Sequence, residues 1–150
     1  MKRIKVLGHP AHPPMVHLPL GHWSAAAVWD AAALFSARSE FWLLAFGCLA
    51  LGCLAGGAAA VTGLADLAAL EDEGSERLAY WHMGLMLTCW SLYFASLIAR
   101  GSWRAPAHAH AAAALDFAGL AVLSVGGWLG GQLVYGRGVG VESKSYNPPR

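Results

Sequence analysis

The chain has 150 residues, of which 57% are hydrophobic and 13% are charged, and its formal net charge is +1. This composition is too apolar for a soluble domain of that length and indicates a membrane protein. The near-neutral charge and the lack of any nucleic-acid-binding motif exclude nucleic acid as a partner.

The N-terminal segment, residues 1–16, is rich in histidine and proline. The prolines around His9 and His12 predict an extended or turn conformation that folds back over the end of the first helix. Crossing ~30 Å of hydrocarbon takes about 20 helical residues. Stretches 17–36, 41–65, 78–99 and 111–135 meet this length. We therefore expect an all-α integral membrane four-helix bundle over residues 17–135, followed by a flexible tail over residues 136–150.

The distribution of Lys and Arg predicts the orientation of these helices, because cytoplasmic loops carry the excess. One side of the membrane receives Lys2, Arg3, Lys5, Arg77, Arg137, Lys144 and Arg150. The other side receives Arg38, Arg100 and Arg104. Both termini, with the 136–150 tail, are thus predicted to be cytoplasmic.

The second and third helices contain all three cysteines of the chain, Cys48, Cys53 and Cys89, without a CxxC motif. We interpret them as small packing residues. The second and fourth helices also contain glycines at small-xxx-small spacing, which lets helix backbones approach closely. This spacing is compatible with plain packing, with a homodimer, or with a haem or quinone ring lying on the glycine face.

Polar groups collect where the first and third helices begin and the second and fourth helices end. They are His9, His12, His17, His22, Asp66, Trp81, His82, Gln132, Tyr135 and Arg137. Four crossings bring all of these to the cytoplasmic side. Ionisable groups in membrane segments are costly and usually functional, so this cluster is the candidate site.

Three hypotheses fit the cluster. The first is a b-type haem held between His82 and a histidine of the first helix, as in helical bundles that clamp a porphyrin. The second is a non-haem Zn, Cu or Fe ion, with His9, His12, His17, Asp66 and His82 as candidate ligands. The third is a structural hydrogen bond, for example from His82 to Asp66, in a non-catalytic subunit of a membrane complex.

Helix geometry narrows the haem hypothesis. Pro19 is best tolerated in the first turn of a helix, so the first helix should begin near Leu18. His17 then lies just before that helix and His22 lies about one turn inside it, at a depth similar to that of His82. Either His17 or His22 is a candidate partner for His82.

The opposite side of the membrane carries fewer polar groups. Asp30 and Asp116 are expected to pair with Arg100 or Arg104 of the connecting loop, as structural anchors at the outer interface. His108 and His110 are interpreted as solvated, because no intramembrane histidine lies on their side to complete a second haem site.

Several motifs together resemble one family. They are Gly8-His9-Pro10, His12-Pro13, Val16-His17 and Pro19 near the N-terminus, then Trp29-Asp30 and Gly63-Leu64-Ala65-Asp66, and finally the run from Gly127 to Val141. This combination, which spans most of the chain, resembles the DUF2231 family of bacterial inner-membrane proteins. The resemblance implies a fold similar to the two-haem b-type cytochromes.

Some members of that family carry a Rieske-type iron–sulfur domain after the last helix, which implies electron transfer at the cytoplasmic face. Gln132 stands where many relatives are expected to have Glu, which weakens a catalytic carboxylate there. The resemblance favours His9, His12, His17, Asp66 and His82 over His22, and His17 with His82 as the axial pair. The resulting expectation is a one-electron relay through a single haem b, with a quinone near Tyr135 and Arg137 or an iron–sulfur partner.

Overall fold

The computed structural model describes residues 3–36, 38–102 and 106–141. Two short strands, β1 (Lys5–Val6) and β2 (His9–Pro10), precede a one-turn helix, α1 (His12–Met15). Four long helices follow: α2 (His17–Ser36), α3 (Ser39–Leu67), α4 (Glu73–Arg100) and α5 (Ala109–Gly131). A π-helical turn, η1 (Gln132–Gly136), extends α5. The described chain is therefore the all-α four-helix fold that the apolar stretches predicted. α2 has the predicted bounds, and α3 and α4 are longer than their stretches at both ends.

The N-terminal segment is more ordered than the extended or turn conformation that its prolines predicted. Leu7 and Gly8 have φ of 51° and 85°, as the tight turn between two antiparallel strands requires. His12 then begins α1, with Pro13 and Pro14 in the first turn, where the missing N–H groups cost no helical hydrogen bond. The prediction of an extended or turn conformation was thus wrong for His12, because these prolines start a helix instead of preventing one.

Local signals explain where α4 begins and ends. The carboxylate of Asp72 accepts a hydrogen bond of 2.8 Å from the backbone N–H of Ser75, which caps the first turn. Gly101 has φ of 58° and ends the helix in the left-handed conformation, which glycine adopts without steric cost. Arg100, predicted to lie in a loop, is instead the last residue of α4.

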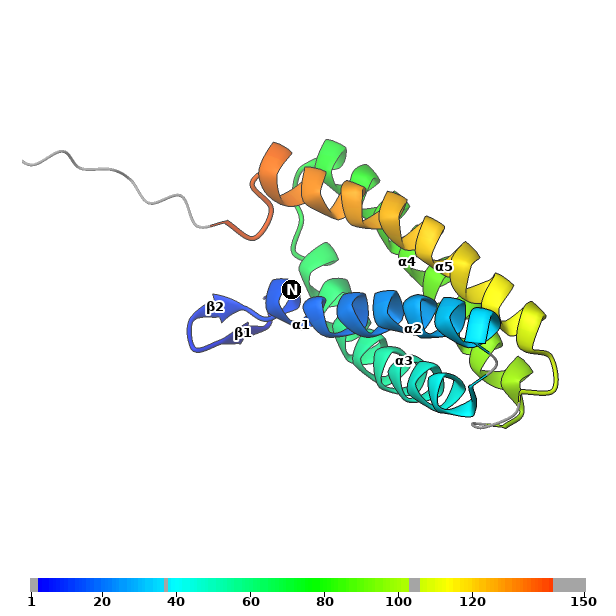
Figure 1. The fold of residues 1–150 in the computed structure, drawn as a ribbon. Helices are drawn as coiled ribbons and strands as arrows, with labels where there is room; N and C mark the ends of the chain where they lie inside the picture. The colour runs from blue at the N-terminus through cyan, green and yellow to red at the C-terminus, as the bar shows by residue number, and fades with distance from the viewer. Residues whose placement is uncertain (1–2, 37, 103–105, 142–150) are drawn as a thin grey trace, which may run out of the picture.

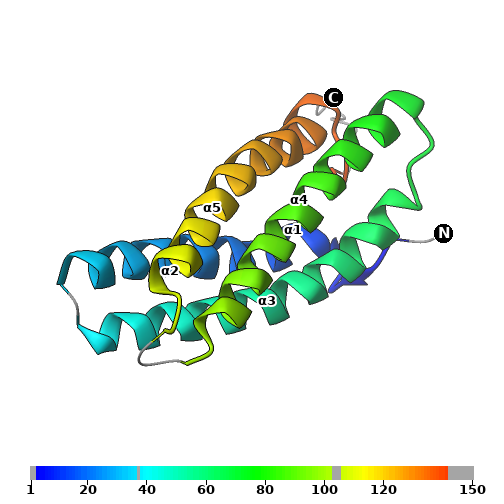
Figure 2. The same cartoon turned by 90° about the vertical axis from the view of Figure 1, so that its right-hand side faces the viewer.

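The four long helices form two antiparallel pairs, α2 with α3 and α4 with α5, which pack across one another (Figure 1). Both views show α2 and α5 converging at one end and separating toward the other (Figures 1 and 2). We call the end with the α2–α3 connection the Arg38 end, and the opposite end, where α1 lies, the His12 end. Every segment that contributes a residue to the predicted polar cluster lies at or near the His12 end. This is the arrangement expected if four helices cross the membrane.

Three helical stretches are long and apolar enough to cross a membrane: Ser39–Leu67, Glu73–Arg100 and Ala109–Gly136. α2 has 20 residues, the length needed for a crossing, and packs along α3, but it carries His17, His22 and Asp30. The helices thus contact a lipid bilayer, and the crossing by α2 stays a prediction.

The core between the two helix pairs is built from aromatic and small residues. Trp23 of α2 stacks on Tyr93 of α4, with ring centroids 4.9 Å apart. Cys53 and Cys89 are buried beside them as free thiols, while Cys48 is half-buried. The interpretation of the cysteines as packing residues is confirmed for Cys53 and Cys89.

Candidate functional site

His12 is held against α3 by its own ring. Its Nδ1 lies 2.9 Å from the carbonyl oxygen of Ala59 and 3.2 Å from the hydroxyl of Thr62, and that hydroxyl donates to the same carbonyl. A carbonyl can only accept a hydrogen bond, so Nδ1 carries the proton and donates to Ala59. The other ring nitrogen, Nε2, then has the lone pair that a metal ligand needs.

His82 repeats this arrangement on the other helix pair. Its Nδ1 donates to the carbonyl oxygen of Gly126 on α5 at 2.8 Å, so Nε2 again carries the lone pair. Because His82 belongs to α4, this hydrogen bond also links α4 to α5. The predicted hydrogen bond from His82 to Asp66 is replaced by this one.

Both rings lie over a glycine one helical turn beyond the carbonyl that they contact. A Cβ at Gly63, four residues after Ala59, would come within 2.8 Å of His12 Cε1. A Cβ at Gly130, four residues after Gly126, would come within 3.0 Å of His82 Cε1. Residues four apart lie on one face of a helix, so each imidazole lies in a notch that a small residue keeps open.

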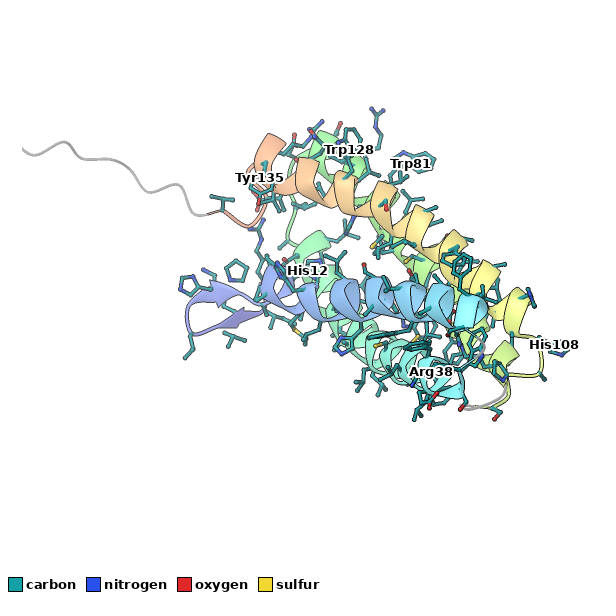
Figure 3. All side chains as sticks on the ribbon, viewed as in Figure 1. His12, Arg38, Trp81, His108, Trp128 and Tyr135 are labelled. Carbon is teal, nitrogen blue, oxygen red and sulfur yellow. The ribbon has the colours of Figure 1, made fainter. Side chains whose placement is uncertain are left out.

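The two imidazoles belong to different helix pairs. His12 contacts α3 toward its C-terminal end, and His82 lies toward the start of α4, the helix that follows, so both lie toward the His12 end. His12 reaches the α2–α3 pair through α1, and His82 lies between α4 and α5. Figure 3 shows His12 at the end of the molecule that also carries Tyr135, far from His108 and Arg38. The structure thus brings together His12 and His82, whereas the sequence favoured His17 with His82.

The other histidines of the cluster bond locally. His17 is exposed, and its Nδ1 contacts the carbonyl oxygen of Pro13, one turn earlier, at 2.9 Å. His22 contacts Leu18 in the same way at 2.7 Å, and its Cβ faces Gly52 of α3. His9 is exposed in strand β2. These hydrogen bonds hold His17 and His22 to their own chain segment instead of across the two helix pairs.

Asp66 pairs with neither histidine in the described chain, where its Oδ1 is buried without a hydrogen-bond partner. Across residues 3–36, 38–102 and 106–141, no three His, Cys, Asp or Glu side chains gather closely enough to hold a metal ion. The set His9, His12, His17, Asp66 and His82 is therefore not assembled as a single metal site.

Arg137 lies on the outer side of the α4–α5 pair. Its guanidinium is 3.6 Å from the carboxylate of Asp72. With Arg77, Leu78 and Trp81 it lines an open hollow of about 440 Å³. Figure 3 shows Trp81 and Trp128 on this outer side, and Tyr135 is 92% exposed. The residues predicted for a quinone, Tyr135 and Arg137, thus lie at the surface, and neither forms a described hydrogen bond with His12 or His82.

A second adjoining hollow involves Gln132, the first residue of η1, together with Trp128 and Arg137. Gln132 is exposed and lies beside Gly136. The amide has no contact with His12 or His82 among the described hydrogen bonds, so it adds nothing to the imidazole pair.

The opposite end of the bundle contains the predicted pairing of aspartate with arginine. Arg100 forms ion pairs with Asp30 and, at 2.8 Å, with Asp116, and all three side chains are at most 1% exposed. The pairing is confirmed for Arg100, and its position at the outer membrane interface stays a prediction. Arg104 lies outside the described residues. His108 and His110 are exposed, as solvated residues should be.

The sequence interpretation missed three partners of the histidines: the Ala59 carbonyl, the Thr62 hydroxyl and the Gly126 carbonyl. The available signal was the spacing of small residues, since Ala59 with Gly63 and Gly126 with Gly130 each stand four apart. This spacing was interpreted as helix packing alone, whereas at these positions it admits an imidazole.

Comparison with known proteins identifies the family to which the chain belongs. No curated protein and no solved structure matches the chain. The likeness to two-haem b-type cytochromes therefore stays a prediction. The model of one family, described as a predicted membrane protein family, matches residues 8–143. The match covers the bundle and both halves of the candidate site, and the chain belongs to the DUF2231 family of membrane proteins.

Proposed function

We propose that this chain is a membrane-bound electron-transfer protein that holds a single haem b between His12 and His82. The observation that supports the proposal most strongly is the repeated arrangement of these two residues. Each donates from Nδ1 to a backbone carbonyl, and each lies over a glycine one turn further along the helix.

The hydrogen bonds favour ligand function for a chemical reason. Histidines that bind iron through Nε2 commonly donate Nδ1–H to a carbonyl or carboxylate, which fixes the ring orientation and the tautomer. His12 and His82 both have this tautomer before any ligand is bound. In the proposal, Nε2 of His12 and Nε2 of His82 would hold the haem iron.

The number of ligands favours haem over a free metal ion. Among the described residues, no three His, Cys, Asp or Glu side chains gather closely enough to hold a metal ion. Zinc sites use three or four protein ligands, whereas a porphyrin supplies four nitrogens itself and needs only an axial pair from the protein. When bound, the haem iron would supply a reversible one-electron change of oxidation state.

The surroundings of the two histidines are also suitable. α2 and α5 separate toward the end of the bundle where α1 lies (Figure 1), and α1 carries His12. The rings of His12 and His82 lie against Gly63 and Gly130. Porphyrins in helical bundles lie between helices with ligands on facing elements. The outer hollow beside Arg77 and Arg137 is kept in this proposal as the place where a quinone or an iron–sulfur protein would approach.

Absorption spectra of alanine variants test the axial pair. We expect His12→Ala and His82→Ala to lose the reduced-minus-oxidised α band of a low-spin haem. The matched controls, His17→Ala and His22→Ala, should retain it, because their rings bond within their own helical segment.

Three results would overturn the proposal. Loss of the haem spectrum in His17→Ala but not in His12→Ala would establish the pair that the sequence favoured. Colourless wild-type protein that still assembles after His82→Ala would identify a structural subunit. Stoichiometric zinc or copper without a Soret band would identify a metal-handling protein.

A further inference from the structure

We propose that Asp30, Arg100 and Asp116 form an intramembrane proton-binding site, in which the two carboxyl groups share one exchangeable proton. We call these three residues the buried triad. It lies toward the Arg38 end, whereas the imidazole pair lies toward the His12 end, so this proposal does not depend on the haem proposal.

Three different helices contribute to the buried triad. Asp30 belongs to α2, Arg100 is the last residue of α4, and Asp116 lies two turns into α5. A single nitrogen, Arg100 Nη2, donates to Oδ2 of both carboxyl groups. Because both Oδ2 atoms lie within one hydrogen-bond length of the same nitrogen, the two carboxyl groups are neighbours.

The charges of the buried triad do not balance when both carboxyl groups are ionised. Two carboxylates and one guanidinium sum to −1, and the three side chains are between 0% and 1% exposed. An uncompensated charge is very costly inside a protein and more so inside a membrane. Binding of one proton from the aqueous phase forms an O–H bond on one carboxyl group and makes the triad neutral.

The unpartnered atoms of the buried triad indicate where this proton binds. Oδ1 of Asp30 and Oδ1 of Asp116 are both buried without a hydrogen-bond partner. A hydrogen on one carboxyl group would provide a donor for the other, which is how neighbouring carboxyl groups share a proton. Nε and Nη1 of Arg100 are also buried without a hydrogen-bond partner among the described residues, so neither of them satisfies the two Oδ1 atoms.

Among the described residues, the groups around the triad do not supply the missing positive charge. From α3, the ring of Trp42 lies under the Arg100 guanidinium, 5.7 Å from its carbon, and Cys53 interacts with Asp116. From α4, Tyr93 and Ser96 also face Asp116. None of these four side chains is cationic, and Ser96 donates to the Ala112 carbonyl.

Infrared spectroscopy can detect the shared proton without altering the buried triad. The chain has four aspartates, and substituting Asp66→Asn and Asp72→Asn leaves Asp30 and Asp116 as the only ones. This doubly substituted protein would be labelled with carboxyl-¹³C aspartate and reconstituted in lipid vesicles. At neutral pH we expect one protonated carboxyl C=O band per chain, shifted by the label and by exchange into D₂O.

Two further variants fix the assignment. Asp30→Asn or Asp116→Asn in the same background should remove the band, because the remaining carboxylate is balanced by Arg100. Arg100→Gln should about double the band, since each carboxyl group then needs its own proton. No band in the background protein, or a band of two carboxyl groups there, would overturn the proposal even if the triad variants do not fold.

Discussion

At the scale of single residues, the candidate site depends on how two imidazoles are anchored. The carbonyls of Ala59 and Gly126 fix Nδ1 as the protonated nitrogen of His12 and His82. The same side chains without those carbonyls would be free to rotate or to exchange tautomers. The hydrogen bonds therefore define the site more closely than the presence of histidine does.

The glycines under the two rings lead to a prediction. Gly63→Ala and Gly130→Ala place a methyl group within 2.8 Å and 3.0 Å of the imidazole carbons, so each ring must move off its carbonyl. We expect both variants to bind less haem than wild type, measured as haem per chain after purification. Gly57→Ala and Gly127→Ala, on the same two helices but facing open space, serve as controls. Equal loss in test and control variants would show that the notches do not position the ligands.

At the scale of helices, Trp23 sets how closely α2 approaches α3. A Cβ at Gly52 would lie 2.6 Å from the indole ring, and one at Gly56 would lie 2.8 Å from it. We expect Gly52→Ala to cost about 1–3 kcal/mol of stability by overpacking, seen as a lower midpoint of thermal unfolding in detergent. Gly47→Ala, on the same helix with open space around it, should stay near wild type. An unchanged midpoint for Gly52→Ala would contradict this packing.

The start of α4 should be sensitive to pH. Hydrogen bonds from Ser75 hold the pKa of the Asp72 carboxyl below its ordinary value, so the ionised form is favoured in the folded chain. The resulting stabilisation is present above the ordinary pKa of aspartate and is lost as the pH falls through the lowered value. We expect Asp72→Ala to unfold at a lower temperature near neutral pH and to differ less from wild type in acid. A constant difference across this range would exclude the carboxylate as the cap.

Much of the element level could be predicted from the sequence. Apolar length located the four long helices, and Pro19 located the start of α2, because hydrocarbon thickness and proline chemistry act locally. The choice of His12 over His17 could not be predicted in this way. The choice depends on a contact between distant parts of the sequence, since α1 packs against Ala59 and Thr62, about fifty residues away. It also depends on the direction in which each imidazole points from the backbone. The burial of Arg100 has a similar origin, because the angle between the helix pairs decides what is interior.

At the scale of the whole molecule, the orientation in the membrane is the open prediction. The Lys and Arg distribution places both termini in the cytoplasm, which requires α2 to cross with the other three helices. Reporter fusions at each terminus should both report a cytoplasmic location. Termini on opposite sides would mean that three helices cross and that α2 does not, so the His12 end would have to be assembled differently.

The two proposed sites, the imidazole pair and the buried triad, lie toward opposite ends of the molecule. α1, which carries His12, lies at the end where the helix pairs diverge (Figures 1 and 3). The buried triad joins the C-terminal end of α4 to α2 and α5 toward the other end. A divergent end can admit a flat cofactor between facing ligands, whereas a convergent end can isolate charges from water. The crossing of the two helix pairs thus produces both environments in one small bundle.

The proposed haem between His12 and His82 is tested most directly by absorption spectroscopy. The absorption spectrum of the purified wild-type protein would be recorded oxidised and after reduction with dithionite. We expect a Soret band and sharp reduced α and β bands, with one haem per chain. A featureless spectrum from folded protein produced with an ample haem supply would contradict it.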